Sequence, residues 1–147
     1  MTPAGRLVAG AGAGGAATVA MTAAMLAGRL VGATPKIEPE AVTEAGLRTL
    51  RLPVGPGPTK AAAAATHLAY GVGMGAAFGL VAPGLPVPGW ARGPLFGLAL
   101  ALASYEGWVP AAGILPWLHE QPAPRGAHIL VSHLVYGAVL GRLTARR

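Results

Sequence analysis

The 147-residue sequence contains no cysteine, no asparagine and no aspartate, and only 11% of its residues are charged. A chain without cysteine has no disulfide, no thiolate metal site and no cysteine nucleophile. A soluble domain has roughly a quarter of its residues charged, because it presents a polar surface to water. This chain has too little charge for such a surface, so the sequence predicts an integral membrane protein.

Apolar side chains make up 53% of the chain, the mean hydropathy is +0.54, and the apolar residues come in long runs. A helix needs about 20 residues to cross a hydrocarbon layer of about 30 Å. Runs that approach this length cover residues 7–30, 61–81, 93–109 and 127–144. Backbone groups in lipid must bond one another, so we predict an all-α integral membrane bundle of four transmembrane helices in one domain, residues 1–147.

Two segments allow a second interpretation. The run 7–30 follows Arg6 and resembles a signal peptide, but its apolar stretch is long for one and no clear processed polar domain follows it. The polar connection 31–60 is either a loop or a short helix on the membrane surface, since Val42 and Leu47 stand among charged residues. Both alternatives for 31–60 stay open at this point.

The net charge of +6 does not indicate a nucleic-acid partner, because the basic residues are scattered near the ends of the apolar runs. Lysine and arginine stand there in membrane proteins to meet lipid headgroups. The Ala/Gly-rich composition is typical of a GC-rich bacterial genome. We therefore expect a multi-pass protein of a bacterial inner membrane, with the lipid bilayer as its partner and a homo-oligomer as an assembly that the sequence allows.

Two stretches nearly repeat each other: "THLAYGVGMG" at 66–75 and "SHLVYGAVLG" at 132–141. Both have the pattern hydroxyl-His-Leu-x-Tyr-Gly-x-x-x-Gly. The repeat fits a duplication in which the first two and last two helices form related hairpins with the same orientation. Chance similarity between Ala/Gly-rich helices is the alternative, because the first and third helices show no convincing match.

Glycines at four-residue spacing follow each histidine of the repeat. Small residues at this spacing allow helix backbones to approach closely in lipid. The predicted packing glycines are Gly71, Gly75, Gly137 and Gly141, and the pair Gly93 and Gly97 has the same spacing.

A polar cluster within the membrane is the candidate functional site. His67 and Tyr70 fall on the glycine face of one helix, and His133 and Tyr136 fall on the matching face of another. Glu106 is the only acid inside an apolar run, and it joins the histidine layer if its helix ends near Pro110. Such a cluster can join helices by hydrogen bonds, conduct protons or ions, hold a divalent metal, or ligate a haem between paired histidines.

The other polar residues give no catalytic motif. His119 and His128 are expected in solvent at the membrane interface, and "HEQPAPR" is too sparse for a zinc motif such as H-E-x-x-H. No phosphate-binding loop, nucleophile elbow or carboxylate pair is present in the sequence. We therefore expect a protein that is not an enzyme and has no cofactor.

The segments "GAATVAMTAAM", "HLAYGVGMG" and "YEGWVPAAGILPW" followed by "SHLVYGAVLG" resemble the YagU-like and related domain-of-unknown-function proteins, a group of small bacterial membrane proteins. The resemblance covers most of the chain outside residues 31–60. It implies a multi-helix inner-membrane protein of poorly defined biochemistry with a loose link to acid tolerance, and it assigns no catalytic residue.

The sequence thus predicts a small non-catalytic membrane protein, a scaffold or a stress-associated component. The main alternative is an oligomeric, proton- or ion-responsive transport protein that uses His67, Glu106 and His133. A metal or haem protein is a third possibility, and the sequence does not fix the orientation of the chain in the membrane.

Overall fold

The computed structural model describes residues 1–34, 36–52 and 55–145. The described residues form an all-α fold without strands. The long helices are α1 (Pro3–Leu30), α2 (Glu38–Thr49), α3 (Pro56–Val81), α4 (Gly89–Ala103) and α6 (Ala123–Ala145). Shorter helical turns complete the chain: η1 (Ala82–Gly84), the π-helical turn η2 (Ser104–Trp108), α5 (Val109–Ala111) and η3 (Leu118–Glu120).

Three helices are long and apolar enough to cross a membrane, which is consistent with the prediction of a membrane protein. They are Pro3–Leu30, Pro56–Gly84 and Ala123–Ala145. The second and third begin about four or five residues before the predicted apolar runs. Proline at the first or second helical position begins α3, where the missing N–H costs no hydrogen bond.

The predicted fourth span is not a single regular helix. The 15-residue α4 begins at Gly89, continues into η2 and then into α5. Inside η2 the backbone of Glu106 (φ −112°, ψ 19°) and Gly107 (φ −141°, ψ −114°) leaves the helical region. The helical path from residue 89 to residue 111 is therefore kinked just before Pro110.

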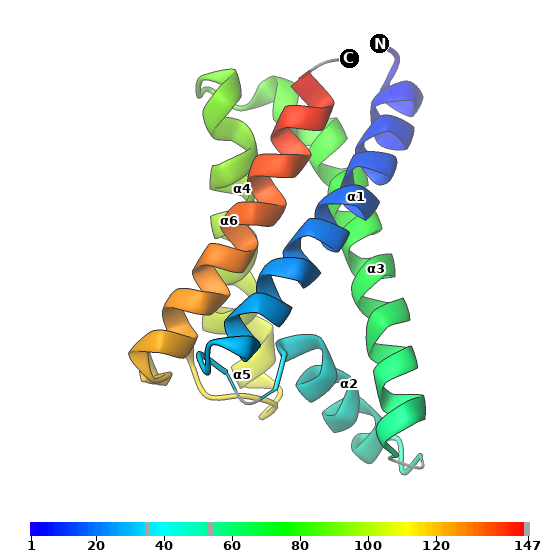
Figure 1. The fold of residues 1–147 in the computed structure, drawn as a ribbon. Coiled ribbons are helices and arrows are strands. Elements are labelled where there is room, and N and C mark those ends of the chain that lie inside the picture. The colour runs from blue at the N-terminus through cyan, green and yellow to red at the C-terminus, as the bar shows by residue number, and fades with distance from the viewer. Residues whose placement is uncertain (35, 53–54, 146–147) are drawn as a thin grey trace.

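The four longest helical segments pack as neighbours in the order α3, α1, α6, α4 (Figure 1). Each packs against its neighbour in antiparallel fashion, and both ends of the chain lie at the same end of the bundle. Met25, Phe78 and Leu140 form the buried core between them, and the rings of Phe78 and Phe96 lie 5.0 Å apart.

Glycine faces bring the backbones of α1 and α3 into contact. A Cβ atom added to Gly14 would meet the carbonyl oxygen of Gly71, and one added to Gly75 would meet the carbonyl oxygen of Gly10. A larger side chain at these positions would force the helices apart, so only glycine permits this approach.

The α4–α6 pair has the same construction. A Cβ atom on Gly93 would meet the carbonyl oxygen of Gly137 and would lie 2.7 Å from the Cα of Gly141. A Cβ atom on Gly97 would meet the carbonyl oxygen of His133. All four packing glycines expected from the repeat thus lie at helix–helix contacts, and the two helix pairs are built alike although their first helices differ in sequence.

The connection 31–60 contains the helix α2. Helix α2 packs against α3 and covers one end of the bundle. Its acids reach basic residues of other segments: Glu40 lies 4.0 Å from Arg29 of α1, and Glu38 lies 3.6 Å from Arg125 of α6. Helix α2 is therefore joined to both central helices by charge.

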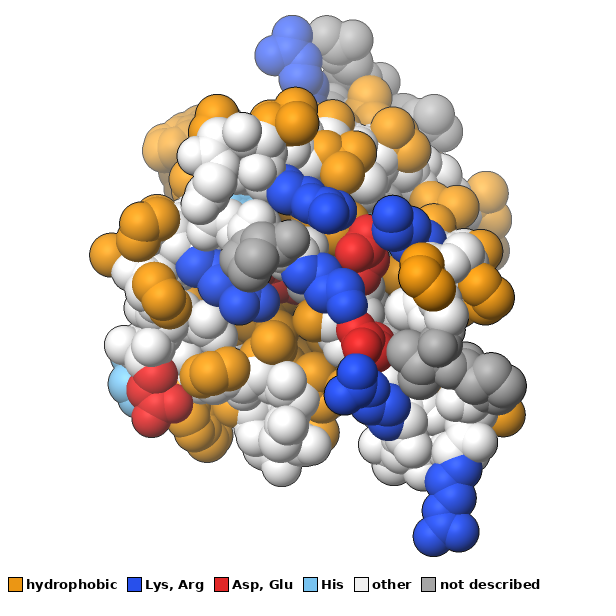
Figure 2. Space-filling model, turned by 60° about the horizontal axis from the view of Figure 1, so that its bottom comes forward, with side chains coloured by type: hydrophobic (Ala, Val, Ile, Leu, Met, Phe, Trp, Pro, Cys, Tyr) orange, Lys and Arg blue, Asp and Glu red, His pale blue; other side chains and the backbone are white. Residues whose placement is uncertain are grey.

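The two ends of the bundle differ in charge. All five glutamates belong to α2, η2 and η3, which lie at the α2 end (Figure 1). Figure 2 shows lysine and arginine side chains gathered around glutamates on this face. At the opposite end lie the basic residues Arg6, Arg92 and Arg142, and no glutamate.

Candidate functional site

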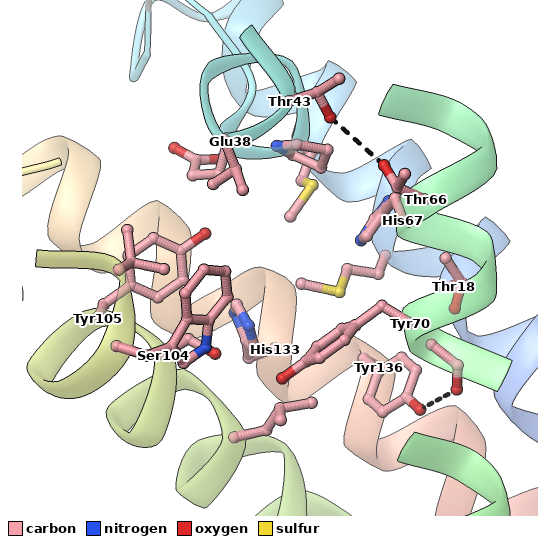
Figure 3. Close-up of a pocket in the computed structure, with 18 residues that line it drawn as sticks. Thr18, Glu38, Thr43, Thr66, His67, Tyr70, Ser104, Tyr105, His133 and Tyr136 are labelled. Atoms are coloured by element: carbon pink, nitrogen blue, oxygen red, sulfur yellow. Dashed lines mark hydrogen bonds between the residues drawn. The ribbon is translucent and has the colours of Figure 1, made fainter. Parts of the chain in front are cut away.

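A cavity of about 240 Å³ lies between α1, α3, η2 and α6, and α2 covers it at one end (Figure 3). The polar lining residues are Thr18, Glu38, Thr43, Thr66, His67, Tyr70, Ser104, Tyr105, His133 and Tyr136. Four of the five residues of the polar cluster expected from the sequence therefore line one cavity.

The rest of the cavity wall is apolar. Met21 and Met25 of α1, Val42 of α2, and Leu100 and Val109 from the kinked α4–α5 path supply it. Met21 and Met25 stand one helical turn apart and are both buried, so they present one continuous thioether surface. An apolar wall with a few polar groups is typical of sites that bind small organic molecules.

His67 is oriented by α1. Its Nδ1 lies 3.3 Å from the hydroxyl oxygen of Thr22, and this hydroxyl donates its own hydrogen to the carbonyl oxygen of Thr18 at 2.8 Å. A threonine hydroxyl has one hydrogen, so the Thr22 oxygen accepts from His67. In neutral His67 the proton therefore sits on Nδ1, and Nε2 has a free lone pair.

Neutral His133 also has its proton on Nδ1, but its hydrogen-bond partner is different. Its Nδ1 lies 2.8 Å from the backbone carbonyl oxygen of Ile129, one turn earlier on α6. A carbonyl only accepts, so Nδ1 donates and Nε2 again has the free lone pair. The ring of Tyr105 packs edge-on against this imidazole at 5.7 Å and buries it.

The two tyrosines of the repeat differ in their surroundings. Tyr136 is buried, and its hydroxyl donates a 2.7 Å hydrogen bond to the carbonyl oxygen of Gly71 on α3. Tyr70 lines the same cavity but is 41% exposed. Tyr136 therefore ties α6 to α3, whereas Tyr70 stands at the edge of the cavity.

The prediction that Glu106 joins the histidine layer is wrong. Glu106 is not among the cavity residues, and its carboxylate accepts from the backbone N–H of His119 at 2.9 Å. The same carboxylate lies 2.9 Å from the ring Nδ1 of His119. Helix geometry accounts for this difference. Gly97 faces the backbone of His133, and Glu106 follows nine residues later, which is about two and a half turns and therefore the opposite side of a regular helix.

Glu38 is the acid that the sequence reasoning missed, and it takes the place expected for Glu106. It lies in the first turn of α2, it is 1% exposed, and it lines the cavity. Burial raises the pKa of the Glu38 carboxyl above its usual value, although its own backbone N–H and Arg125 act in the opposite direction. No local sequence pattern indicated its burial, because Glu38 stands among other charged residues in a polar connection.

The expectation for the remaining histidines holds for one of them. The side chain of His119 is 66% exposed beside Glu106. The prediction that His128 is solvated is wrong, because this residue is 8% exposed and its ring packs onto Gly28 of α1. Glycine at position 28 leaves the space that the imidazole fills.

Within the described ranges, no three His, Cys, Asp or Glu side chains are grouped closely enough to hold a metal ion. The cavity instead offers two imidazole acceptors, tyrosine and serine hydroxyls and one buried carboxyl on an apolar frame. This set favours non-covalent binding of a small molecule by hydrogen bonds.

The fold and the cavity define a small helical protein with three helices long and apolar enough to span a membrane and a site between its helices. The chain belongs to DUF6789, a family of unknown function, whose model matches residues 4–147. The expectation of a domain of unknown function over most of the chain is thereby confirmed. Comparison with curated proteins and with solved structures gave no match.

Proposed function

We propose that this protein is a non-catalytic component of a bacterial inner membrane that binds a small lipid-soluble molecule in the cavity between α1, α3, η2 and α6. The observation that carries the proposal is this cavity of about 240 Å³, which has an apolar wall and a few convergent polar groups. In this proposal the glycine-packed pairs α1–α3 and α4–α6 are the scaffold that holds the cavity.

The exposed residues at the cavity support access from the lipid. Tyr70 on α3 and Trp108 on η2 line the cavity and are 41% and 47% exposed. Leu68 and Leu102 on the neighbouring helical segments are exposed as well. An opening with apolar surroundings favours a ligand that arrives from the bilayer over one that arrives from water.

Four membrane crossings are part of the proposal. The path from α4 through η2 to α5 runs over residues 89–111, about the length needed to cross the hydrocarbon layer. A π turn and a kink within such a path are tolerated where the irregular backbone faces protein or a cavity, and Ser104 and Tyr105 of η2 do line the cavity. The resemblance of the sequence to YagU-like proteins implies the same multi-helix architecture.

Extraction of the purified protein tests the proposal. Organic extracts of detergent-purified protein are compared by mass spectrometry for the native chain, a cavity-filling variant Ser104→Phe, and Ala103→Phe as the matched control. Ser104 is buried in the cavity wall, whereas the adjacent Ala103 is exposed.

We expect one molecular species at near-stoichiometric amounts with the native chain and with Ala103→Phe, and its loss from Ser104→Phe. An equal amount with all three chains would contradict the proposal, since it would place the molecule outside the cavity. Thermal unfolding of each variant establishes that Ser104→Phe is folded.

A second function, proton- or ion-responsive transport, is supported by a separate observation. Glu38, His67 and His133 all line the same cavity, which places three titratable groups along one space. Flux into proteoliposomes over roughly pH 5 to 8, where imidazoles titrate, distinguishes this function from binding alone. Flux that is lost in a folded His67→Ala/His133→Ala variant would support transport, and absence of flux with the native chain would leave binding alone.

A further inference from the structure

We infer that the paired histidines recognise a dihydroxy-aromatic ligand of the hydroquinone type, whose two hydroxyl hydrogens are accepted by the Nε2 atoms of His67 and His133. This inference rests on the proposed binding function and names the chemistry of the ligand.

In both histidine rings, hydrogen bonds to the protein determine which nitrogen atom carries the proton. Thr22 accepts from Nδ1 of His67, and the carbonyl of Ile129 accepts from Nδ1 of His133. Both neutral imidazoles therefore present an unprotonated Nε2, which is the ring atom farthest from the helix backbone. The repeated motif thus places two acceptors of the same kind on two different helices.

The two Nε2 acceptors belong to residues of the cavity wall. Both histidines line the cavity, and neither Nε2 takes part in a hydrogen bond among the described residues. An acceptor that faces a largely apolar cavity without a protein partner is open to a ligand, so a molecule that donates hydrogen bonds has an advantage over one that does not. Two acceptors that line one cavity from different helices, His67 from α3 and His133 from α6, favour a molecule with two donors (Figure 3).

The volume of the cavity and its apolar wall match one aromatic ring. An apolar cavity of about 150 Å³ holds a benzene molecule, so a cavity of about 240 Å³ holds one substituted aromatic ring. Met21, Met25 and Leu100 form the wall and match the apolar faces of such a ring. The opening beside Tyr70 and Trp108 lets an apolar tail of the ligand extend into the bilayer.

The test compares trimethylhydroquinone with its 1,4-dimethyl ether, which keeps the ring but lacks both hydroxyl hydrogens. Equilibrium dialysis against detergent-purified protein under argon measures both affinities, and empty micelles of the same detergent give the background. We expect the hydroquinone to bind at least about tenfold more tightly than the ether, since each hydrogen bond contributes a factor of a few.

Leucine has a volume close to that of histidine without its nitrogen atoms. We expect His67→Leu and His133→Leu each to lose most of this preference, and the double variant to bind both compounds equally. His119→Leu, at an exposed histidine outside the cavity, keeps the native preference.

Equal binding of the two compounds to the native chain overturns the inference but leaves the proposed binding function standing. Failure of both compounds to bind also overturns it. The proposed function then fails as well only if no molecule is extracted from the cavity of the native protein. A preference that persists in the folded double variant would place the recognition at other residues and overturn the inference too.

Discussion

The hydroxyl of Tyr136 on α6 donates a 2.7 Å hydrogen bond to the backbone carbonyl of Gly71 on α3. The tyrosine belongs to the second copy of the repeated motif and the glycine to the first. The copies are therefore joined by a direct bond across the bundle, although α3 and α6 are not main packing neighbours. The corresponding Tyr70 is 41% exposed, so the two copies perform different tasks.

We expect Tyr136→Phe to lower the free energy of unfolding by about 1 kcal/mol, because it removes one buried hydrogen bond and keeps the ring. Tyr70→Phe is the matched control and should change it by less than about 0.5 kcal/mol, as exposed substitutions usually do. Unfolding in mixed detergent micelles measures both. A loss of equal size in the two variants would contradict the role of the Tyr136–Gly71 bond.

Gly75→Ala should destabilise the bundle by about 1–3 kcal/mol, the usual range for overpacking. Its Cβ would lie 2.5 Å from the Cα of Gly14 and would meet the carbonyl oxygen of Gly10, and neither backbone atom can move independently of its helix. Gly73→Ala, two residues away on the exposed side of α3, meets nothing within 4 Å. This control should be neutral or slightly stabilising in the same unfolding experiment, since alanine favours helix.

The burial of His128 against Gly28 predicts a compensating pair of substitutions. Gly28→Ala places a methyl group against the His128 ring and should cost about 1–3 kcal/mol. In the His128→Ala background the ring is gone, so adding Gly28→Ala should cost much less. A double-mutant cycle of unfolding free energies measures this coupling. Additive effects would show that the ring does not occupy the space above Gly28.

Glu38 should make the stability of the protein depend on pH. Burial raises its pKa in the folded chain, so between the ordinary and the raised pKa the folded state binds more protons than the unfolded state. The stability should therefore fall as the pH rises through this window, and Glu38→Gln should remove this part of the slope. Arg125 and His128 lie close by and contribute their own charges, so the difference between the native and Glu38→Gln chains is the quantity to follow.

Glu44→Gln is the control for this pH experiment. The ammonium group of Lys36 lowers the pKa of the Glu44 carboxyl in the folded chain. The Lys36–Glu44 pair therefore stabilises the fold at pH values above the ordinary pKa, and this stabilisation is lost as the pH falls. The Glu44 and Glu38 variants should thus alter the pH profile with opposite signs. Profiles that change in the same direction would contradict the burial of Glu38.

The sequence was sufficient to predict the features that depend on residue type and spacing alone. Long apolar runs identify the helices because lipid leaves the backbone few alternatives. The glycine spacing of Gly71 and Gly75 identifies their packing face because close approach needs the absence of a side chain. Both signals are local. The structure has long helices at three of the four predicted runs and close backbone contacts at the glycines, whereas the fourth run is a kinked path.

The site depended on relationships that no local pattern contains. The backbone leaves the helical region at Glu106 and Gly107, where the Glu106 carboxylate accepts from His119, and the sequence does not reveal a π turn in an apolar run. Glu38 enters the cavity because α2 folds back across the end of the bundle, which is a long-range event. His128 is buried because Gly28 of another helix makes room for it.

The uneven placement of acids gives the protein an electrical polarity along the long axis of the helix bundle. Arg29 and Arg125 are neutralised by glutamates of α2, whereas Arg6, Arg92 and Arg142 at the other end face no glutamate. In an energised membrane each elementary charge gains about 2.3 kcal/mol per 100 mV on the negative side. In the inner-membrane location that we propose, the transmembrane voltage should therefore hold the end with both termini on the cytoplasmic side, so that α2 closes the cavity toward the cell exterior.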